Sequence, residues 1–175
     1  MARRIGWLVL GFVIAIVLFV VGGYVFVNEG GVPMATSSAP LPFEKTVARM
    51  ALRASDRQAA SEKNPLPLSD DNLAAGATVY RDHCAVCHGR PGQTSEFARA
   101  MFPQPPQLFA ADQMVTDDPE GITYWKVTNG IRLSGMPGFG QLLSDDQRWQ
   151  ATMLVAHADT LSDRAKSILA SAQPH

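Results

Sequence analysis

The stretch DHCAVCHGRP, residues 82–91, contains both cysteines of the 175-residue chain, Cys84 and Cys87, and His88 follows the second cysteine directly. On a helix, positions i, i+3 and i+4 share a face, so the two thiols and the imidazole would point toward one object. Two thiols at this spacing can add to the two vinyl groups of a haem while the next imidazole coordinates the iron, which is the usual interpretation of C-x-x-C-H. The stretch therefore predicts one covalently attached haem, held by Cys84 and Cys87 and ligated by His88.

A zinc site and a thiol–disulfide redox site are the alternatives for this motif. A structural zinc ion needs four protein ligands, and beyond the motif only His83, His157 and His175 could add an imidazole. The sequence has no second cysteine pair. A redox-active pair of the thioredoxin type belongs to a βαβ pattern, which this sequence lacks. Haem attachment is therefore the interpretation that fits best.

Three short helices with loops between them are expected around the motif, and the sequence shows no strand-like alternation. The first helix has its N-cap at one of residues 69–71 and runs to the cysteines. The second spans about 119–129 and is capped by Asp118. The third starts at Ser144, where a glutamine three residues later completes a capping box. An all-α domain with so much loop and no disulfide needs a large apolar group, such as a haem, to complete its core.

A second iron ligand is predicted at Met136, within the sequence GMPGFG at 135–140. The flanking glycines free the backbone, and the proline that follows biases Met136 toward an extended conformation, so its thioether can be presented on a defined loop. Met101 and Met114 lie in loops without this framing and are the rival ligands. Met153 is spaced for core packing on its helix.

Over residues 69–161 these features resemble a class I c-type cytochrome. Gly76, Tyr80 and Cys84 fall four apart, as in the N-terminal helix of that family. There the glycine permits close crossing by the C-terminal helix, and the aromatic residue packs against it. By this resemblance Trp149 is the aromatic residue of the C-terminal helix.

The resemblance implies further roles for residues around the haem. The distal methionine of the family lies in a loop just before the last helix, which is the place of Met136. A proline carbonyl, from Pro105 or Pro106, would accept the N–H of the proximal imidazole, and Tyr124 or Trp125 would reach a haem propionate or pack in the core. Seven apolar residues should mostly pack against the macrocycle: Phe97, Phe102, Leu108, Phe109, Ile131, Leu133 and Phe139.

An uncharged run at residues 5–27 precedes this domain. As a helix it would extend about 34 Å, which is enough to cross a hydrocarbon core of about 30 Å. Arg3 and Arg4 place the short N-terminus, residues 1–4, in the cytoplasm, so the rest of the chain would lie on the periplasmic side of a bacterial inner membrane. A cleaved signal peptide is the alternative, but its apolar region usually spans only about 7–15 residues.

Two segments connect the expected transmembrane helix to the haem domain, which is placed at 64–175. Residues 28–42 are rich in Gly, Pro and Ser and are expected to form a flexible linker. Residues 43–63 lack Gly and Pro, are rich in good helix formers and are expected to form a basic helix. A positive residue recurs at every fourth position of this segment: Lys45, Arg49, Arg53 and Arg57. Such a stripe is either a solvated face or a contact for anionic headgroups or an acidic partner subunit.

Iron with both His88 and Met136 bound has no open position for a substrate, so the expected function is electron transfer rather than catalysis. We expect a membrane-anchored monohaem cytochrome c that carries single electrons from a donor, such as a quinol-oxidising complex, to a terminal oxidase or reductase. The alternatives are a fixed subunit of a larger respiratory complex and a haem enzyme or gas sensor with a displaceable Met136. Two of the 15 Lys and Arg residues precede the apolar run. The rest of the chain has 13 Lys and Arg against 16 Asp and Glu, and this net negative charge does not favour nucleic-acid binding.

Overall fold

Helices are the regular elements of residues 2–171, the part of the chain that the computed structural model describes, and no strand is assigned within that range. The expected all-α fold is thereby confirmed. The chain divides into two units, one that ends at Lys45 and one that begins at Thr46.

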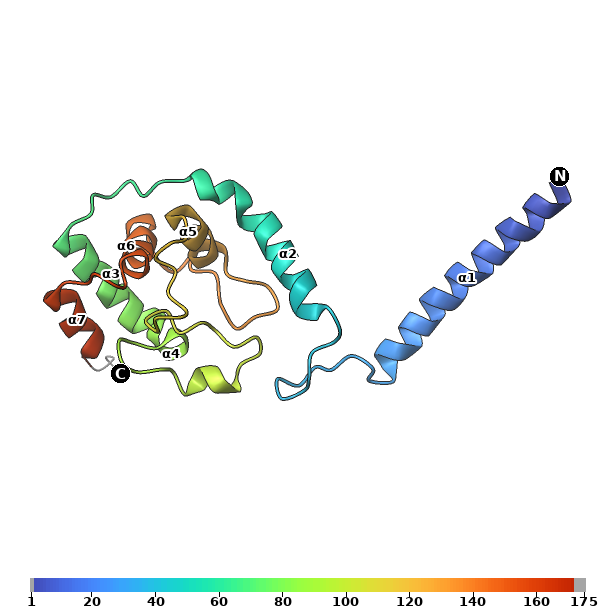
Figure 1. Ribbon diagram of the computed structural model, residues 1–175, viewed down its shortest axis with the longest axis horizontal. Coiled ribbons are helices and arrows are strands. Elements are labelled where there is room, and N and C mark those ends of the chain that lie inside the picture. Colours follow the sequence, from blue (N-terminus) through green and yellow to red (C-terminus); the bar gives the residue numbers. More distant parts are fainter. Residues whose placement is uncertain (1, 172–175) are drawn as a thin grey trace. The chain divides into compact units, whose positions relative to one another are not determined.

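The first unit is a long apolar helix, α1 (Ala2–Asn28), followed by turns up to residue 43 (Figure 1). Its part from Arg3 to Asn28 is long and apolar enough, by length and composition, to cross a membrane, and none of that part is buried. The helix contains the whole of the predicted apolar segment 5–27.

The second unit contains the remaining helices, which Figure 1 shows in chain order. Their bounds are α2 (Glu44–Asp56, which starts just before the unit boundary), the 3-10 helix η1 (Arg57–Ser61), α3 (Asp70–His83), α4 (Ala85–His88), the 3-10 helix η2 (Phe97–Ala100), α5 (Glu120–Asn129), α6 (Asp145–Ala156) and α7 (Asp163–Ala170). The helices α3 and α6 begin as the sequence predicts. Ser69 caps α3 by accepting a hydrogen bond from the amide of Asn72, and Ser144 forms the expected capping box with Gln147 at the start of α6.

The helices α3 and α6 cross in close backbone contact. A Cβ atom added at Gly76 of α3 would lie only 2.2 Å from the carbonyl oxygen of Gln150 in α6. The two backbones can approach this closely because glycine has no side chain. Trp149 is 5% exposed beside the crossing, as expected for the aromatic residue of this helix.

A further helix, α7, follows α6 and packs against α3. The sequence pattern predicted three helices around the motif, and α7 was not among them. Ser162 caps it by accepting a hydrogen bond from the amide of Ala165, and Ala165 and Leu169 are fully buried one turn apart. The cap followed by two apolar residues at i+3 and i+7 was the signal available in the sequence. Ala165 and Leu169 belong, with Leu161, Tyr80 and Leu154, to the main apolar cluster.

The helix α5 ends as predicted but begins differently. Gly130 follows its last residue with a φ of 69°, a backbone conformation that favours glycine. The predicted N-cap Asp118 is wrong, because the helix starts at Glu120 and its N-cap position is Pro119, which has no side chain that can cap.

The short helix η1 packs on α5, so the region before residue 64 takes part in the fold. A Cβ atom added at Gly121 would lie 1.9 Å from the carbonyl oxygen of Ala59. Just before η1, the buried carboxylate of Asp56 lies 3.7 Å from the ammonium group of Lys126 on α5. A buried carboxylate with a cationic partner fixes the end of α2 to the domain.

We expect Gly76→Ala to destabilise the protein. In an open helix the exchange would stabilise by about 1 kcal/mol, but here the new Cβ meets backbone, which cannot move aside as a flexible side chain can. The net loss in the free energy of unfolding should be about 2 kcal/mol or more, measured by guanidinium titration. Thr78→Ala, on the exposed side of the same helix, is the matched control and should change it by less than about 0.5 kcal/mol. Equal stability of the two variants would contradict the close crossing.

Candidate functional site

The C-x-x-C-H motif forms one helical turn at the end of α3. The amide of Cys84 donates to the carbonyl of Tyr80 at 2.8 Å, and the amide of His88 donates to the carbonyl of Cys84 at 2.9 Å. This i to i+4 bond places Cys84 and His88 one turn apart, with Cys87 beside them. The hydroxyl of Tyr80 donates to the carbonyl of Gly89 at 3.0 Å and so holds the end of this turn against α3.

The ring of His88 is oriented by a backbone carbonyl. Its Nδ1 lies 2.8 Å from the carbonyl oxygen of Pro106. Because a carbonyl can only accept, Nδ1 carries the proton and the lone pair is on Nε2. Burial lowers the pKa of His88, and the hydrogen bond to Pro106 raises it by a smaller amount. The imidazole is therefore neutral at pH 7, with one nitrogen free for a metal, and of the two candidate prolines Pro106 is the acceptor.

The two thiols have properties that oppose a nucleophilic or redox role. Burial, with a smaller contribution from Cys87, raises the pKa of Cys84 to about 12, and burial also raises the pKa of Cys87. Reactive cysteines have lowered pKa values, because the thiolate is the reacting species. Within residues 2–171 no group of three or more His, Cys, Asp or Glu side chains is arranged to hold a metal ion. His175, a possible zinc ligand by sequence, lies outside the described residues.

The loop that carries Met136 is fixed to the end of α5. The amide of Ile131 donates to the carbonyl of Met136 at 3.2 Å, and the amide of Met136 donates to the hydroxyl of Ser134 at 3.1 Å. Three residues later, the amide of Phe139 donates to the carbonyl of Val127 at 2.9 Å. Met136 itself is half-buried. These bonds define the backbone on both sides of the thioether.

The chemistry of this donor set suits a haem. It offers two thiols and a neutral imidazole on one helical turn, together with a thioether on a defined loop. Residues 71–153 match the protein family described as cytochrome c oxidase, cbb3-type, subunit III. The domain is a c-type cytochrome. No curated protein matches the chain significantly.

Gln107 is the residue of the cytochrome domain that the sequence analysis missed. Its side chain is buried and joins three backbone segments: Nε2 donates to the carbonyls of Cys87 at 3.0 Å and Pro105 at 3.2 Å, and Oε1 accepts from the amide of Ser95 at 2.6 Å. The loop that presents the Pro106 carbonyl is thereby tied to the haem-attachment motif. A single glutamine in a proline-rich stretch gives no signal of this role, because the partners are backbone groups and two of them, at Cys87 and Ser95, are distant in sequence.

Met101, one of the rival ligands, lies beside the Met136 loop of the cytochrome domain. A Cβ atom added at Gly135 would lie 2.1 Å from the terminal methyl of Met101. Met153 is 2% exposed within α6, as expected for core packing. Met114 is half-buried in the loop before α5. The structure thus brings Met101, but not Met153, to the same place as Met136.

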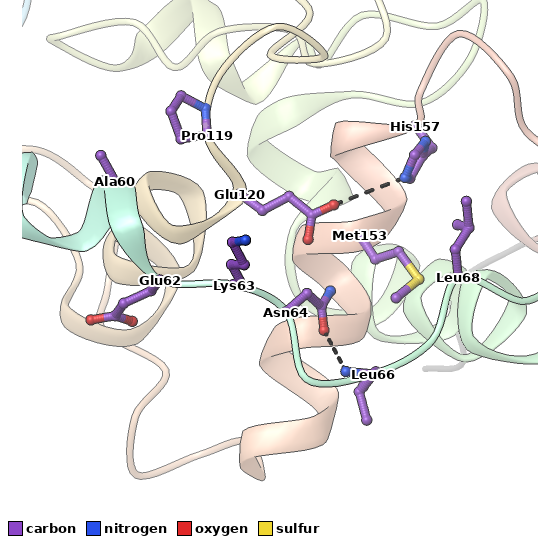
Figure 2. A pocket seen from close by; sticks show the side chains of 10 residues that line it. All are labelled: Ala60, Glu62, Lys63, Asn64, Leu66, Leu68, Pro119, Glu120, Met153 and His157. Carbon is purple, nitrogen blue, oxygen red and sulfur yellow. Dashed lines mark hydrogen bonds and ion pairs between the residues drawn. The ribbon is translucent and has the colours of Figure 1, made fainter.

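A cavity of about 440 Å³ lies where residues 60–68 meet the start of α5 and the end of α6 (Figure 2). It is lined by ten residues: Ala60, Glu62, Lys63, Asn64, Leu66, Leu68, Pro119, Glu120, Met153 and His157. The carboxylate of Glu120 and the imidazole of His157 face each other there at 3.9 Å. None of the predicted haem-binding residues lines this cavity, so His157 lies away from the predicted haem site.

The aromatic residues expected around the haem have different environments. Tyr124 stacks on Trp149 with ring centroids 3.9 Å apart, and its hydroxyl donates to the carboxylate of Asp145. Of the two expected roles, Tyr124 therefore has the one in packing. Phe109 contacts Tyr80 edge to face. Phe139 is buried in a cluster with residues of α3 and α6. Leu133 is 92% exposed and Phe97 is 60% exposed, so these two do not belong to either apolar cluster.

We expect Gln107→Leu to loosen the cytochrome domain at the motif. Leucine is similar in size but would leave buried backbone groups of Cys87, Pro105 and Ser95 without their partner, at a cost of about 2–4 kcal/mol in the free energy of unfolding. Gln104→Leu, at an exposed position of the same loop, is the control and should change it by less than about 0.5 kcal/mol. NMR of the reduced protein should also show faster exchange of the His88 Nδ1 proton in Gln107→Leu only. Unchanged stability and exchange would contradict the positioning role.

Proposed function

We propose that this protein is a membrane-anchored monohaem c-type cytochrome that transfers single electrons between respiratory partners. The observation that carries the proposal is the His88 ring, which follows two thiols directly and has Nδ1 bound to the Pro106 carbonyl at 2.8 Å. That bond leaves Nε2 as an iron ligand in a defined orientation.

Four residues would hold the haem in this proposal. Cys84 and Cys87 would bind it covalently through thioether bonds, His88 would be the proximal iron ligand and Met136 the distal one. Haem c, when bound, supplies a reversible one-electron couple. A methionine ligand raises the reduction potential, and two protein ligands leave no open position for a substrate. The pair therefore supports electron transfer rather than catalysis.

The helix α1 would serve as the membrane anchor. It is long and apolar enough to cross a bilayer, and Arg3 and Arg4 at its start favour a cytoplasmic N-terminus. The haem domain would then lie on the periplasmic side of a bacterial inner membrane. Anchoring keeps the domain at a high local concentration near its partners, which we propose to be a quinol-oxidising complex and a terminal oxidase or reductase.

A fixed subunit of a larger respiratory complex is the second candidate. It is favoured by the description of the matched family, which names a subunit of a cytochrome c oxidase. In that case α1 would pack against other subunits instead of lying alone in the bilayer.

The distal ligand can be tested by optical spectroscopy. We expect the oxidised protein to show the weak near-red band of sulfur-to-iron charge transfer, Met136→Ala to lose it, and Met101→Leu to keep it. Met136→Ala should also bind carbon monoxide when reduced, because an iron position is then open. Persistence of the band in Met136→Ala would assign the ligand to another methionine. Ready carbon monoxide binding by the unaltered reduced protein would instead favour a haem enzyme or gas sensor.

Anchoring and assembly can be tested together in native membranes. We expect the haem-containing chain to stay with the membrane in an alkaline carbonate wash, because an apolar helix of this length has no stable place in water. After extraction in a mild detergent, a free carrier should elute as one chain with its micelle. Elution with oxidase subunits would favour the second candidate, and release by carbonate would contradict the anchor.

A further inference from the structure

The helix α2 carries an apolar stripe that nothing in the described part of the chain covers. Val47, Met50, Ala51 and Ala54 follow the i, i+3, i+4, i+7 spacing, which places them on one face. Val47 is 62% exposed and Met50 is 66% exposed, and both alanines are exposed as well. Within residues 2–171, the contact of α2 with another helix is the ion pair of its last residue, Asp56, with Lys126 of α5, and the rest of α2 packs against no other helix. Such a face needs a partner, because exposed apolar stripes at helical spacing mark interaction sites.

A stripe of positive charge borders the apolar stripe. Arg49 and Arg53 of α2 and Arg57, the first residue of η1, recur every four residues and are all exposed. At 100° per residue, Arg53 lies about 60° from Met50 on the helix surface, whereas Arg49 lies about 20° from Asp56. An apolar stripe with arginines along its edge is typical of helices that lie in the interface of a membrane with anionic lipids.

The opposite side of α2 faces the cytochrome domain at its C-terminal end. Asp56 is buried and pairs with Lys126 of α5, and Leu52, one turn earlier on the same side, is half-buried. The helix therefore has a domain side at its end and a free amphipathic side. The apolar stripe lies roughly opposite Asp56 on the helix, so binding of that stripe would leave the contact with α5 in place.

The chain before α2 limits how far this surface can be from a bilayer. Residues 29–43 separate α1 from α2, and a fully extended chain of this length reaches about 50 Å. If α1 is the anchor proposed above, the first residue of α2 stays within about 50 Å of the end of α1. A lipid partner is then present at high effective concentration, which a soluble protein partner is not.

We propose that α2 lies in the interface of an anionic bilayer, with its apolar stripe at the acyl boundary and its arginines at the lipid phosphates. This inference rests on the proposed membrane anchor. It gives α2 a role beyond that of a spacer, because a helix fixed to both lipid and α5 restricts the orientations of the cytochrome domain above the membrane.

The test uses the full-length haem-containing protein in nanodiscs of phosphatidylcholine, with or without phosphatidylglycerol. A nitroxide on Met50→Cys reports the apolar stripe, and the same label on Ala48→Cys, two residues away and about 200° round the helix, is the control. Collisions with dissolved oxygen and with a water-soluble nickel chelate measure lipid and water exposure. We expect several-fold protection of the Met50 label from the chelate in phosphatidylglycerol discs and no protection of the Ala48 label.

Replacing Arg49, Arg53 and Arg57 by glutamine should abolish the protection of the Met50 label from the nickel chelate. Each basic side chain favours binding to an anionic surface by about fivefold, so the triple variant should lower the ratio of bound to free helix on the order of 100-fold. Its haem spectrum should be unchanged, because none of the three arginines belongs to the haem site.

The outcomes separate this proposal from the anchor on which it rests. If the haem protein does not copurify with the discs, the anchor itself is wrong. If it copurifies but the Met50 label stays open to the chelate, the anchor holds and the interfacial helix is overturned. Equal protection of the Met50 label in both lipid compositions would also overturn the interfacial helix. Protection only in native membranes that contain redox partners would overturn it in favour of a protein partner.

Discussion

The close contact between α3 and α6 at Gly76 is the constraint on which the cytochrome domain depends. The turn with both cysteines and His88 continues directly from α3, so the position of α3 determines where that turn lies. Only a residue without a Cβ atom allows the backbone of Gln150 to come this near. Packing density in a protein interior leaves little room for adjustment, and a shift at the crossing would pass to the motif at the end of the helix.

Different groups of the site bind and orient. The proposed ligand atoms belong to side chains, and hydrogen bonds around them define their setting: the Pro106 carbonyl orients the His88 ring, and the Ile131 amide and the Ser134 hydroxyl hold the backbone of Met136. Gln107 connects the carbonyls of Cys87 and Pro105 without itself offering a proposed ligand atom. Orientation of a ligand by a second layer of hydrogen bonds is how proteins adjust the basicity and stability of a metal site.

Local signals in the sequence predicted much of this structure. The C-x-x-C-H spacing and the serine caps of α3 and α6 each have a physical cause within a few residues, whereas the role of the glycine at the α3–α6 crossing followed from the family resemblance, because its partner Gln150 is distant in sequence. What the sequence did not predict depends on distant partners: α7 is a helix because Leu169 and Ala165 are buried against α3, and Gln107 is important because of backbone groups up to twenty residues away. Asp118 is not the cap because the helix begins one residue later than the pattern indicated, which makes Pro119 the N-cap position.

The contacts of η1 and α7 have a consequence for anyone who wishes to excise the electron-transfer domain. A fragment trimmed to the family match, residues 71–153, would lose Ala59, which packs against Gly121, and the three apolar residues Leu161, Ala165 and Leu169. The loss would uncover the aromatic ring of Tyr80 to water, and apoprotein aggregation during maturation would follow. The smallest autonomous piece therefore starts before α2 ends and extends through the last helix.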